Sequence, residues 1–277
     1  MNSSDTRAGV VAGMSWPAKR LAIQIAVAAL FFLAWEYLPR IAFLSQNVKF
    51  LDPFFISSPV AVWKSVIGLI TGNNSLKVTI WPYLFNTVIA TVIGSSIGLV
   101  LGALAGLVFS NSRTLSEVVR PFIVILNSVP RVAIIPIFVV IVGATIMASV
   151  MSVVAVVFFL GFFNAFEGGR SISQPVLDNA KLLGASHFEV MRSIRLPMVL
   201  TWTFAAVPNA ISFGLIVAVT TELLAGVPGM GALLQTATAN IQADLTFGII
   251  VVLSIVGLAL YWGTTALRSY VIHWQQD

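Results

Sequence analysis

The sequence predicts an all-α polytopic membrane protein with six transmembrane helices. Of its 277 residues, 58% are hydrophobic and only 9% are charged. The apolar residues gather into long stretches that short polar stretches separate. A soluble domain could not bury this much apolar surface, whereas a bundle of spanning helices leaves it in contact with lipid.

Charge and residue usage exclude several classes of function. The formal net charge of +5 is spread over the loops rather than gathered into a basic stripe, so we expect no nucleic acid partner. The chain contains no Cys and two His, both in loop or tail positions. We therefore predict neither a catalytic residue nor a metal site in this chain.

The first apolar stretch covers residues 21–38, after a polar tail of residues 1–20 that ends in a Lys-Arg pair. At about 1.5 Å per residue, a helix of this length crosses most of a ~30 Å hydrocarbon core. It lacks a small-x-small cleavage site, and Trp35 and Tyr37 are typical of the membrane interface. We interpret it as an uncleaved span.

An amphipathic helix is predicted beyond this span, in a region too polar to cross the membrane. Ser58 and Pro59 form a helix start, apolar residues follow at helical spacing, and Gly72 supplies the stop. We expect this helix to lie on the outer membrane surface. Residues 21–80 thus make up the first span and an outer amphipathic segment.

The second span, residues 81–109, carries glycines at four-residue intervals, which make a smooth ridge along one helix face. Such a ridge predicts that another helix packs closely against it. The four glycines are Gly94, Gly98, Gly102 and Gly106.

The third span, residues 121–143, contains Pro130 and Pro136, each of which removes an amide donor and tends to kink a helix. A five-span core over residues 81–267 is completed by three further spans, at 145–166, 198–224 and 245–267.

Several polar side chains fall inside these spans, where they need a partner or a water-filled path. Arg131 stands beside a proline break, and an ionisable group at membrane depth is costly unless it faces a cavity or a partner. Each of these side chains could equally be satisfied by a neighbouring helix. The candidates for a substrate path are Asn86, Asn127, Ser128, Arg131, Asn164, Asn209 and Glu222.

Residues 167–197 form the one long polar interruption in the second half of the chain. A short helix is predicted from Val176 to Leu183, with Val176, Leu177, Ala180 and Leu183 on one face. Gly184 ends it and lets a second helix, from about Ser186 to Arg195, pack closely at the joint. Pro197 suits the first turn of the span that follows.

The spacing of this interruption resembles the cytoplasmic signature of bacterial binding-protein-dependent ABC importer permeases of type I. That signature reads Glu-Ala-Ala, three residues, Gly, nine residues, Ile-x-Leu-Pro, and here it is carried by Asp178, Ala180, Gly184, Ile194, Leu196 and Pro197. Asp178 stands where the family usually has Glu, and Asn179 where it usually has Ala.

A second stretch resembles one subfamily of these permeases. Pro130, Ala133 and Pro136 are similar to a proline-rich stretch in the permeases for nitrate, sulfonates, taurine and precursors of thiamine or riboflavin. Arg131 and Ser128 occupy places where many of those members carry Pro.

The resemblance implies a function and a set of partners. The chain would move a small polar or anionic organic solute, or an inorganic anion, inward by ATP-driven alternating access. The partners would be two ABC ATPase subunits, a second permease copy in a homodimer, and an extracytoplasmic solute-binding protein. The ATPase would dock on a coupling loop that includes Asp178, Asn179, Ala180, Lys181, Leu183, Gly184, Ala185, Ile194, Leu196 and Pro197.

The chain itself has no phosphate-binding loop, since no G-x-x-x-x-G-K-[ST] motif occurs in it. ATP and Mg would therefore be bound by the partner ATPase. A proton- or sodium-coupled carrier normally keeps carboxylates within its spans, but Glu36 and Glu222 lie near predicted span ends. An ATPase-independent carrier or channel, or a membrane scaffold subunit, remains the alternative.

Basic residues indicate the orientation in a bacterial inner membrane. Six spans put both tails, residues 1–20 and 268–277, on one side. If that side is the cytoplasm, the distribution follows the positive-inside rule. The residues inside are then Arg7, Lys19, Arg20, Arg113, Arg120, Arg170, Lys181, Arg192, Arg195 and Arg268, against Arg40, Lys49, Lys64 and Lys77 outside.

Overall fold

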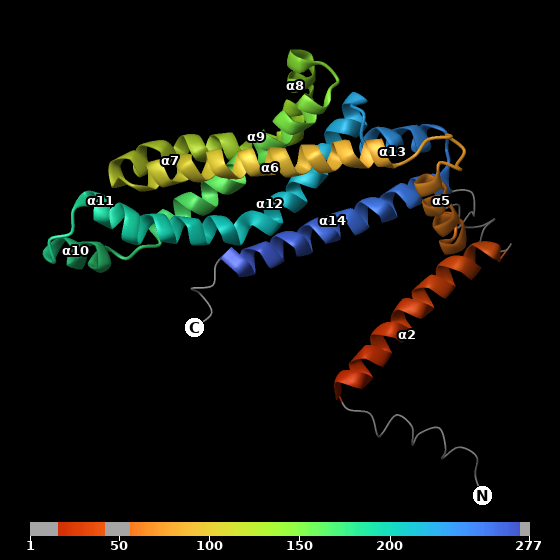
Figure 1. The fold of residues 1–277 in the computed structure, drawn as a ribbon, viewed down its shortest axis with the longest axis horizontal. Helices are drawn as coiled ribbons and strands as arrows, with labels where there is room; N and C mark the ends of the chain where they lie inside the picture. The colour runs from red at the N-terminus through yellow and green to blue at the C-terminus, as the bar shows by residue number, and fades with distance from the viewer. Residues whose placement is uncertain (1–15, 42–55, 272–277) are drawn as a thin grey trace, which may run out of the picture.

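The computed structural model describes residues 16–41 and 56–271, and every regular element within these ranges is a helix (Figure 1). In chain order the helices are α2 (Trp16–Tyr37), η1 (Leu38–Arg40), α5 (Pro59–Thr71), α6 (Trp81–Ser110), α7 (Arg113–Ser128), η3 (Arg131–Ile134), α8 (Ile135–Val142), α9 (Ile146–Arg170), α10 (Gln174–Leu182), α11 (His187–Val190), η4 (Met191–Arg195), α12 (Leu196–Ala225), α13 (Met230–Ala239) and α14 (Ala243–Val271).

Five helices in these ranges are long and apolar enough to cross a membrane. They correspond to the first, second, fourth, fifth and sixth predicted spans, and the all-α prediction is confirmed. The five stretches are Lys19–Arg40, Trp81–Ser110, Ile146–Arg170, His187–Ala225 and Ala243–Leu267.

The third predicted span is present as a broken segment rather than as one kinked helix. Helix α7 ends at Ser128, Pro130 is extended with φ −62° and ψ 106°, and η3 and α8 follow. Proline disfavours the helical conformation in the residue before it, so the chain leaves the helix ahead of Pro130. Pro136 falls in the first turn of α8, where its missing amide has no partner to lose.

Helices α6 and α9 form the centre of the bundle, and the glycine ridge of α6 faces α9 as predicted. A Cβ atom on Gly102 would lie 2.2 Å from the carbonyl oxygen of Phe158, and one on Gly94 would lie 2.6 Å from Cβ of Val153. These distances are shorter than any van der Waals contact. The two backbones therefore approach as closely as they do only because the ridge has no side chains.

Helix α12 packs against both α6 and α9. Ser95 Oγ of α6 donates to the carbonyl of Ala210 at 3.3 Å. A Cβ atom on Gly214 would lie 2.2 Å from that same hydroxyl oxygen, so a second close approach depends on glycine. The buried residues of this three-helix core are Ala90, Leu99, Val153, Val157, Ala210 and Ala218.

The predicted amphipathic helix is confirmed as α5. Ser58 Oγ accepts from the amide of Ala61 at 3.3 Å, and Gly72 closes the helix in the left-handed region with φ +79°. Val62, Val66 and Leu69 are buried, and α5 packs on α14. Trp63, beside this buried face, is exposed.

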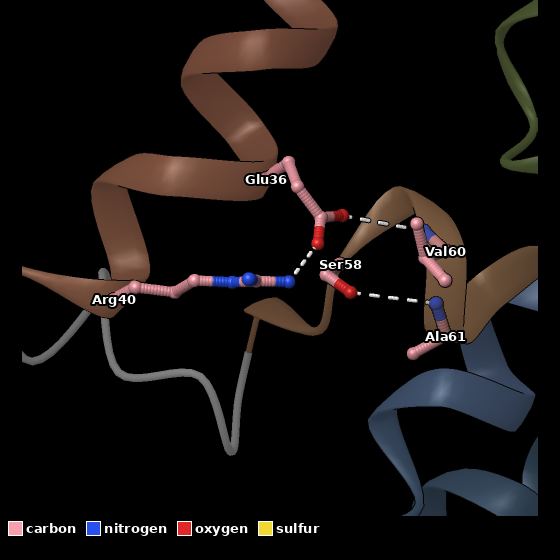
Figure 2. A network of polar contacts seen from close by, with 5 residues as sticks. All are labelled: Glu36, Arg40, Ser58, Val60 and Ala61. Carbon is pink, nitrogen blue, oxygen red and sulfur yellow. Dashed lines mark hydrogen bonds and ion pairs between the residues drawn. The ribbon is translucent and has the colours of Figure 1, made fainter.

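Helix α2 contacts this end of the bundle and otherwise diverges from it (Figure 1). Figure 2 shows Glu36 bridging the two parts: its carboxylate accepts from the amide of Val60 in the first turn of α5 at 3.4 Å and pairs with Arg40. Trp35 donates from Nε1 to the carbonyl of Ile56 at 3.1 Å. In the part of the chain that the structure describes, these bonds anchor the first span at its C-terminal end.

The α6–α9 contact predicts that Gly102→Ala lowers the stability of the fold. The added methyl must displace the α9 backbone, and overpacking of this kind costs about 1–3 kcal/mol. Gly263→Ala in α14 is the matched control, because no atom lies within 4 Å of its Cβ position. Thermal unfolding in detergent should show a lower midpoint for Gly102→Ala and an unchanged or higher one for the control. Equal midpoints would contradict the proposed contact.

Candidate functional site

The polar interruption folds into a helical elbow, residues 171–195, at one end of the bundle (Figure 1). It consists of α10, the Gly184 joint, α11 and η4, so the predicted order of helix, glycine and helix is confirmed. Helix α9 runs on to Arg170, and residues 167–170 therefore belong to the helix rather than to the connection. Helix α10 begins at Gln174, two residues before the predicted start, because Pro175 favours its first turn.

Gly184 is required by its backbone conformation rather than by close packing. Its φ is +82°, in the left-handed region, and no atom lies within 4 Å of a Cβ built on it. The expectation that Gly184 lets two helices pack closely is therefore wrong. The residue ends α10 as a left-handed cap, with the amide of Ala185 donating to the carbonyl of Ala180 at 3.0 Å.

The second arm of the elbow begins with a capping box. Ser186 Oγ accepts from the amide of Glu189 at 3.3 Å, and the Ser186 amide donates to the Glu189 carboxylate at 2.7 Å. These two bonds satisfy amides that would otherwise be left free at the start of α11.

The second arm does not end before the next span, as the sequence suggested, but continues into it. The π-helical turn η4 joins α11 to α12, and Pro197 lies in the first turn of α12 as predicted. Pro197 has no amide to donate to the carbonyl of Ser193, so the α-helical hydrogen-bond pattern is interrupted there. The wider π-helical turn lets the helix continue from α11 into α12 without a break. Arg195 Nη1 donates to the carbonyl of Ser110 at 3.2 Å and ties the elbow to the end of α6.

The predicted apolar face of the first arm is divided between the interior and the surface. Leu177 is buried and Ala180 is half-buried, whereas Val176 and Leu183 are exposed. Leu182, Leu183 and Phe188 are 84%, 88% and 70% exposed, and we name these three residues the apolar tip. Large side chains with so little cover mark a surface that another molecule can contact.

The signature residues are distributed over both arms. Asp178 and Lys181 are exposed and form an ion pair at 3.9 Å, and Asn179 is also exposed. A hollow of about 380 Å³ lies between the joint and the second arm, with Leu183, Gly184, Ala185 and Ile194 among its lining residues. Leu196 and Pro197 follow in the first turn of α12.

Two substrate-path candidates, Ser128 and Asn164, hydrogen-bond within their own helices. Ser128 Oγ donates to the carbonyl of Val124 at 2.9 Å, and Asn164 Nδ2 donates to that of Leu160 at 2.8 Å. Asn209 is exposed on α12. The side chains of Asn127 and Arg131 lie outside what the structure describes; their backbones belong to α7 and η3.

The two remaining candidates meet at the opposite end of the bundle from the elbow. Asn86 Nδ2 donates to the carbonyl of Pro228 at 3.0 Å. Glu222 is only 1% exposed, and its carboxyl group accepts from Thr87 and from the amide of Gly231. Sequence reasoning missed Thr87, because nothing distinguishes it from the other threonines of the spans.

Five span-length helices, a proline-broken segment and a polar elbow with the importer spacing define a multi-pass permease. The chain belongs to the family described as the binding-protein-dependent transport system inner membrane component, whose model matches residues 98–272. The match includes the C-terminal part of α6, all of α9 and the whole elbow.

Relatives support the same class. A probable ABC transporter permease protein of Haemophilus influenzae is 29% identical over 66% of this chain and 75% of its own length. The taurine transport system permease protein TauC of Escherichia coli is 22% identical over 95% of this chain and 93% of its own length. The formylaminopyrimidine transport permease protein ThiX of Halalkalibacterium halodurans is 24% identical over 81% and 88%.

The fold also matches a solved transporter. A chain of the MetNI methionine ABC transporter, in an inward-facing conformation, aligns with a TM-score of 0.61 and 17% identity over 69% of this chain and 95% of that one. At this identity the match concerns the fold alone. With the family assignment, it confirms the predicted type I ABC importer permease, a multi-pass protein of the inner membrane.

The capping box predicts that Ser186→Ala loosens the second arm of the elbow. Loss of an N-cap side chain costs about 1 kcal/mol, which corresponds to roughly fivefold faster local opening. Hydrogen exchange of the amides of residues 187–190 should rise by about this factor. Ser173→Ala is the matched control, since the Ser173 side chain makes no capping bond to α10. Equal exchange in the two variants would contradict the role of the box.

Proposed function

We propose that this permease imports a small polar or anionic solute by alternating access and is energised by a separate ABC ATPase that docks on the elbow. One observation carries the proposal: the apolar tip projects from the elbow with its three side chains at least 70% exposed. The tip lies next to the importer signature and is too apolar to face water without a partner.

The elbow and both tails are assigned to the cytoplasm in this proposal. The support is the excess of Lys and Arg that this orientation places inside. ATP and Mg would be held by the ATPase, because the sequence of the permease contains no phosphate-binding loop.

The proposed assembly contains two permease copies and two ATPase subunits, with a solute-binding protein on the outer side. Each permease offers one elbow, and a symmetric homodimer is the simplest way to match two ATPases. The apolar faces that α2 and α14 leave exposed would contact lipid or the second copy.

Force from the ATPase would reach the membrane through one rod. The helical stretch from His187 to Ala225 is 39 residues long and joins the elbow to the opposite end of the bundle. Closure of the two ATPases on ATP would draw the elbows together and open the cavity outward. Hydrolysis would reverse the movement.

The substrate class is inferred from the relatives and from the path candidates. The relatives carry names for taurine, riboflavin, formylaminopyrimidine and aliphatic sulfonates, which are all small and polar. Asn127, Ser128, Arg131 and Asn209 are the side chains we propose for the path, with Arg131 as the charge that favours an anion.

The proposal predicts that the double variant Leu182→Asp and Leu183→Asp separates the permease from its ATPase. Both side chains are exposed, so folding and membrane insertion should not change. Burying two carboxylates in an interface should reduce the ATPase recovered with the tagged permease by about tenfold or more. Co-purification from gently solubilised membranes, followed by an uptake assay, measures this.

Ile241→Asp is the control for this variant, because Ile241 is 58% exposed in the connection between α13 and α14, far from the elbow along the chain. It should retain the ATPase. Full recovery of the ATPase with the double variant would remove the elbow from its proposed role and reopen the carrier, channel and scaffold alternatives.

A further inference from the structure

A buried carboxyl group hydrogen-bonds the start of α13, directly after the turn of residues 226–229 that follows α12. Glu222 lies in the last turn of α12 and is 1% exposed. Thr87 Oγ1 of α6 lies 2.9 Å from its Oε1 and 2.8 Å from its Oε2, and the Gly231 amide donates to Oε2 at 2.9 Å. One carboxyl group thus joins α6, α12 and α13.

The Thr87 hydroxyl both donates and accepts hydrogen bonds in this contact. Its hydroxyl donates toward Glu222 and also accepts from the amide of Met230, the first residue of α13, at 2.9 Å. The amides of Met230 and Gly231 are among those that a helix leaves unpaired at its start. Two side chains from other helices therefore supply the N-terminal capping bonds of α13.

Two glycines make room for this arrangement. A Cβ atom on Gly229 would lie 2.1 Å from the carboxyl carbon of Glu222, and one on Gly231 would lie 2.2 Å from the carbonyl oxygen of Val219. Gly226 ends α12 in the left-handed region with φ +66°. A side chain at Gly229 would displace the Glu222 carboxyl group, and a side chain at Gly231 would press on the α12 backbone and move α13.

The opposite face of α13 is packed in an apolar cluster with α5, α6 and α14. Apolar packing positions α13 against these helices but is not directional. The hydrogen bonds of Glu222 are directional: the Gly231 amide joins α13 directly to α12, and Thr87 adds α6 to the same contact. The buried residues of the cluster are Leu69, Ile80, Met230, Leu233, Ala237, Leu245 and Ile249.

We propose that Glu222 is a positioning residue that delivers movement of the α12 rod to α13. The elbow is at one end of this rod and Glu222 is at the other, so a displacement begun at α11 reaches α13 through the Glu222–Thr87–Gly231 contact. This proposal rests on the proposed function, since it needs an ATPase to move the elbow.

The test uses the complete complex of permease, ATPase and solute-binding protein in proteoliposomes loaded with Mg-ATP, with taurine, riboflavin and an aliphatic sulfonate as radiolabelled probes. Glu222→Leu should lower uptake per ATP hydrolysed by at least about fivefold, as expected when buried directional hydrogen bonds are lost. ATPase recovery and ATP hydrolysis should stay at the wild-type level, because the elbow is untouched.

A conservative variant distinguishes a role of Glu222 in hydrogen bonding from a role in packing alone. Glu222→Gln should keep coupling near wild type, because its amide oxygen can accept from Gly231 and its amide nitrogen can donate to Thr87. Thr221→Val is the matched control: Thr221 is buried beside Glu222, and its hydroxyl bonds only the carbonyl of Val217 in its own helix. It should also remain coupled.

A second variant keeps the proposal testable if Glu222→Leu does not fold. Thr87→Val removes only a hydroxyl and should uncouple in the same direction, whereas Thr91→Val, one turn along α6, should not. The chain contains no Cys, so spin labels can be placed directly at Ile216→Cys and Gln235→Cys. The distribution of distances between these two labels should broaden in Thr87→Val and stay unchanged in Thr91→Val.

Two results would overturn the proposal: wild-type coupling with an unchanged distance distribution in Thr87→Val, or equal loss of coupling in Glu222→Gln and Glu222→Leu. Failure of the proposed function would look different, because the wild-type chain would then recover no ATPase at all.

Discussion

The close backbone contact between α6 and α9 is the constraint on which the rest of the structure depends. In a membrane, apolar side chains gain nothing by leaving lipid for one another, so helices associate through packing and interhelical hydrogen bonds. Glycines on α6 make that packing close, and the end of α9 continues the contact, because a Cβ atom on Gly169 would lie 2.1 Å from Ser110 Oγ. This fixes where the chain leaves α9, and thereby where the elbow stands.

The two ends of the bundle differ in how they are held. At the elbow end, short helices with local caps are fixed to the bundle by few long-range bonds, of which Arg195 to Ser110 is one. At the α13 end, an apolar cluster and the Glu222 contact join four helices and the end of α12. One continuous helical stretch, residues 187–225, connects the two ends, which fits the proposed transfer of force from the ATPase.

Hydropathy and residue spacing were enough to predict five of the spans, the α5 cap and stop, and the glycine ridge, because each depends on local chemistry or on one helix face. The sequence predicts a kink at Pro130, whereas the helix ends there. A proline can either kink a helix or end it, and the packing of neighbouring residues decides which of the two occurs. The role of Gly184 was misread because a left-handed cap and a close approach both require glycine. Thr87 was missed because two of its partners, Glu222 and Met230, are more than a hundred residues away in sequence.

The most direct test of the account is a native mass measurement on the tagged chain, purified gently from its own membranes with every protein that accompanies it. We expect an assembly of two copies of this chain with two ATPase subunits. A lone chain, or a chain bound only to proteins without nucleotide-binding motifs, would contradict it.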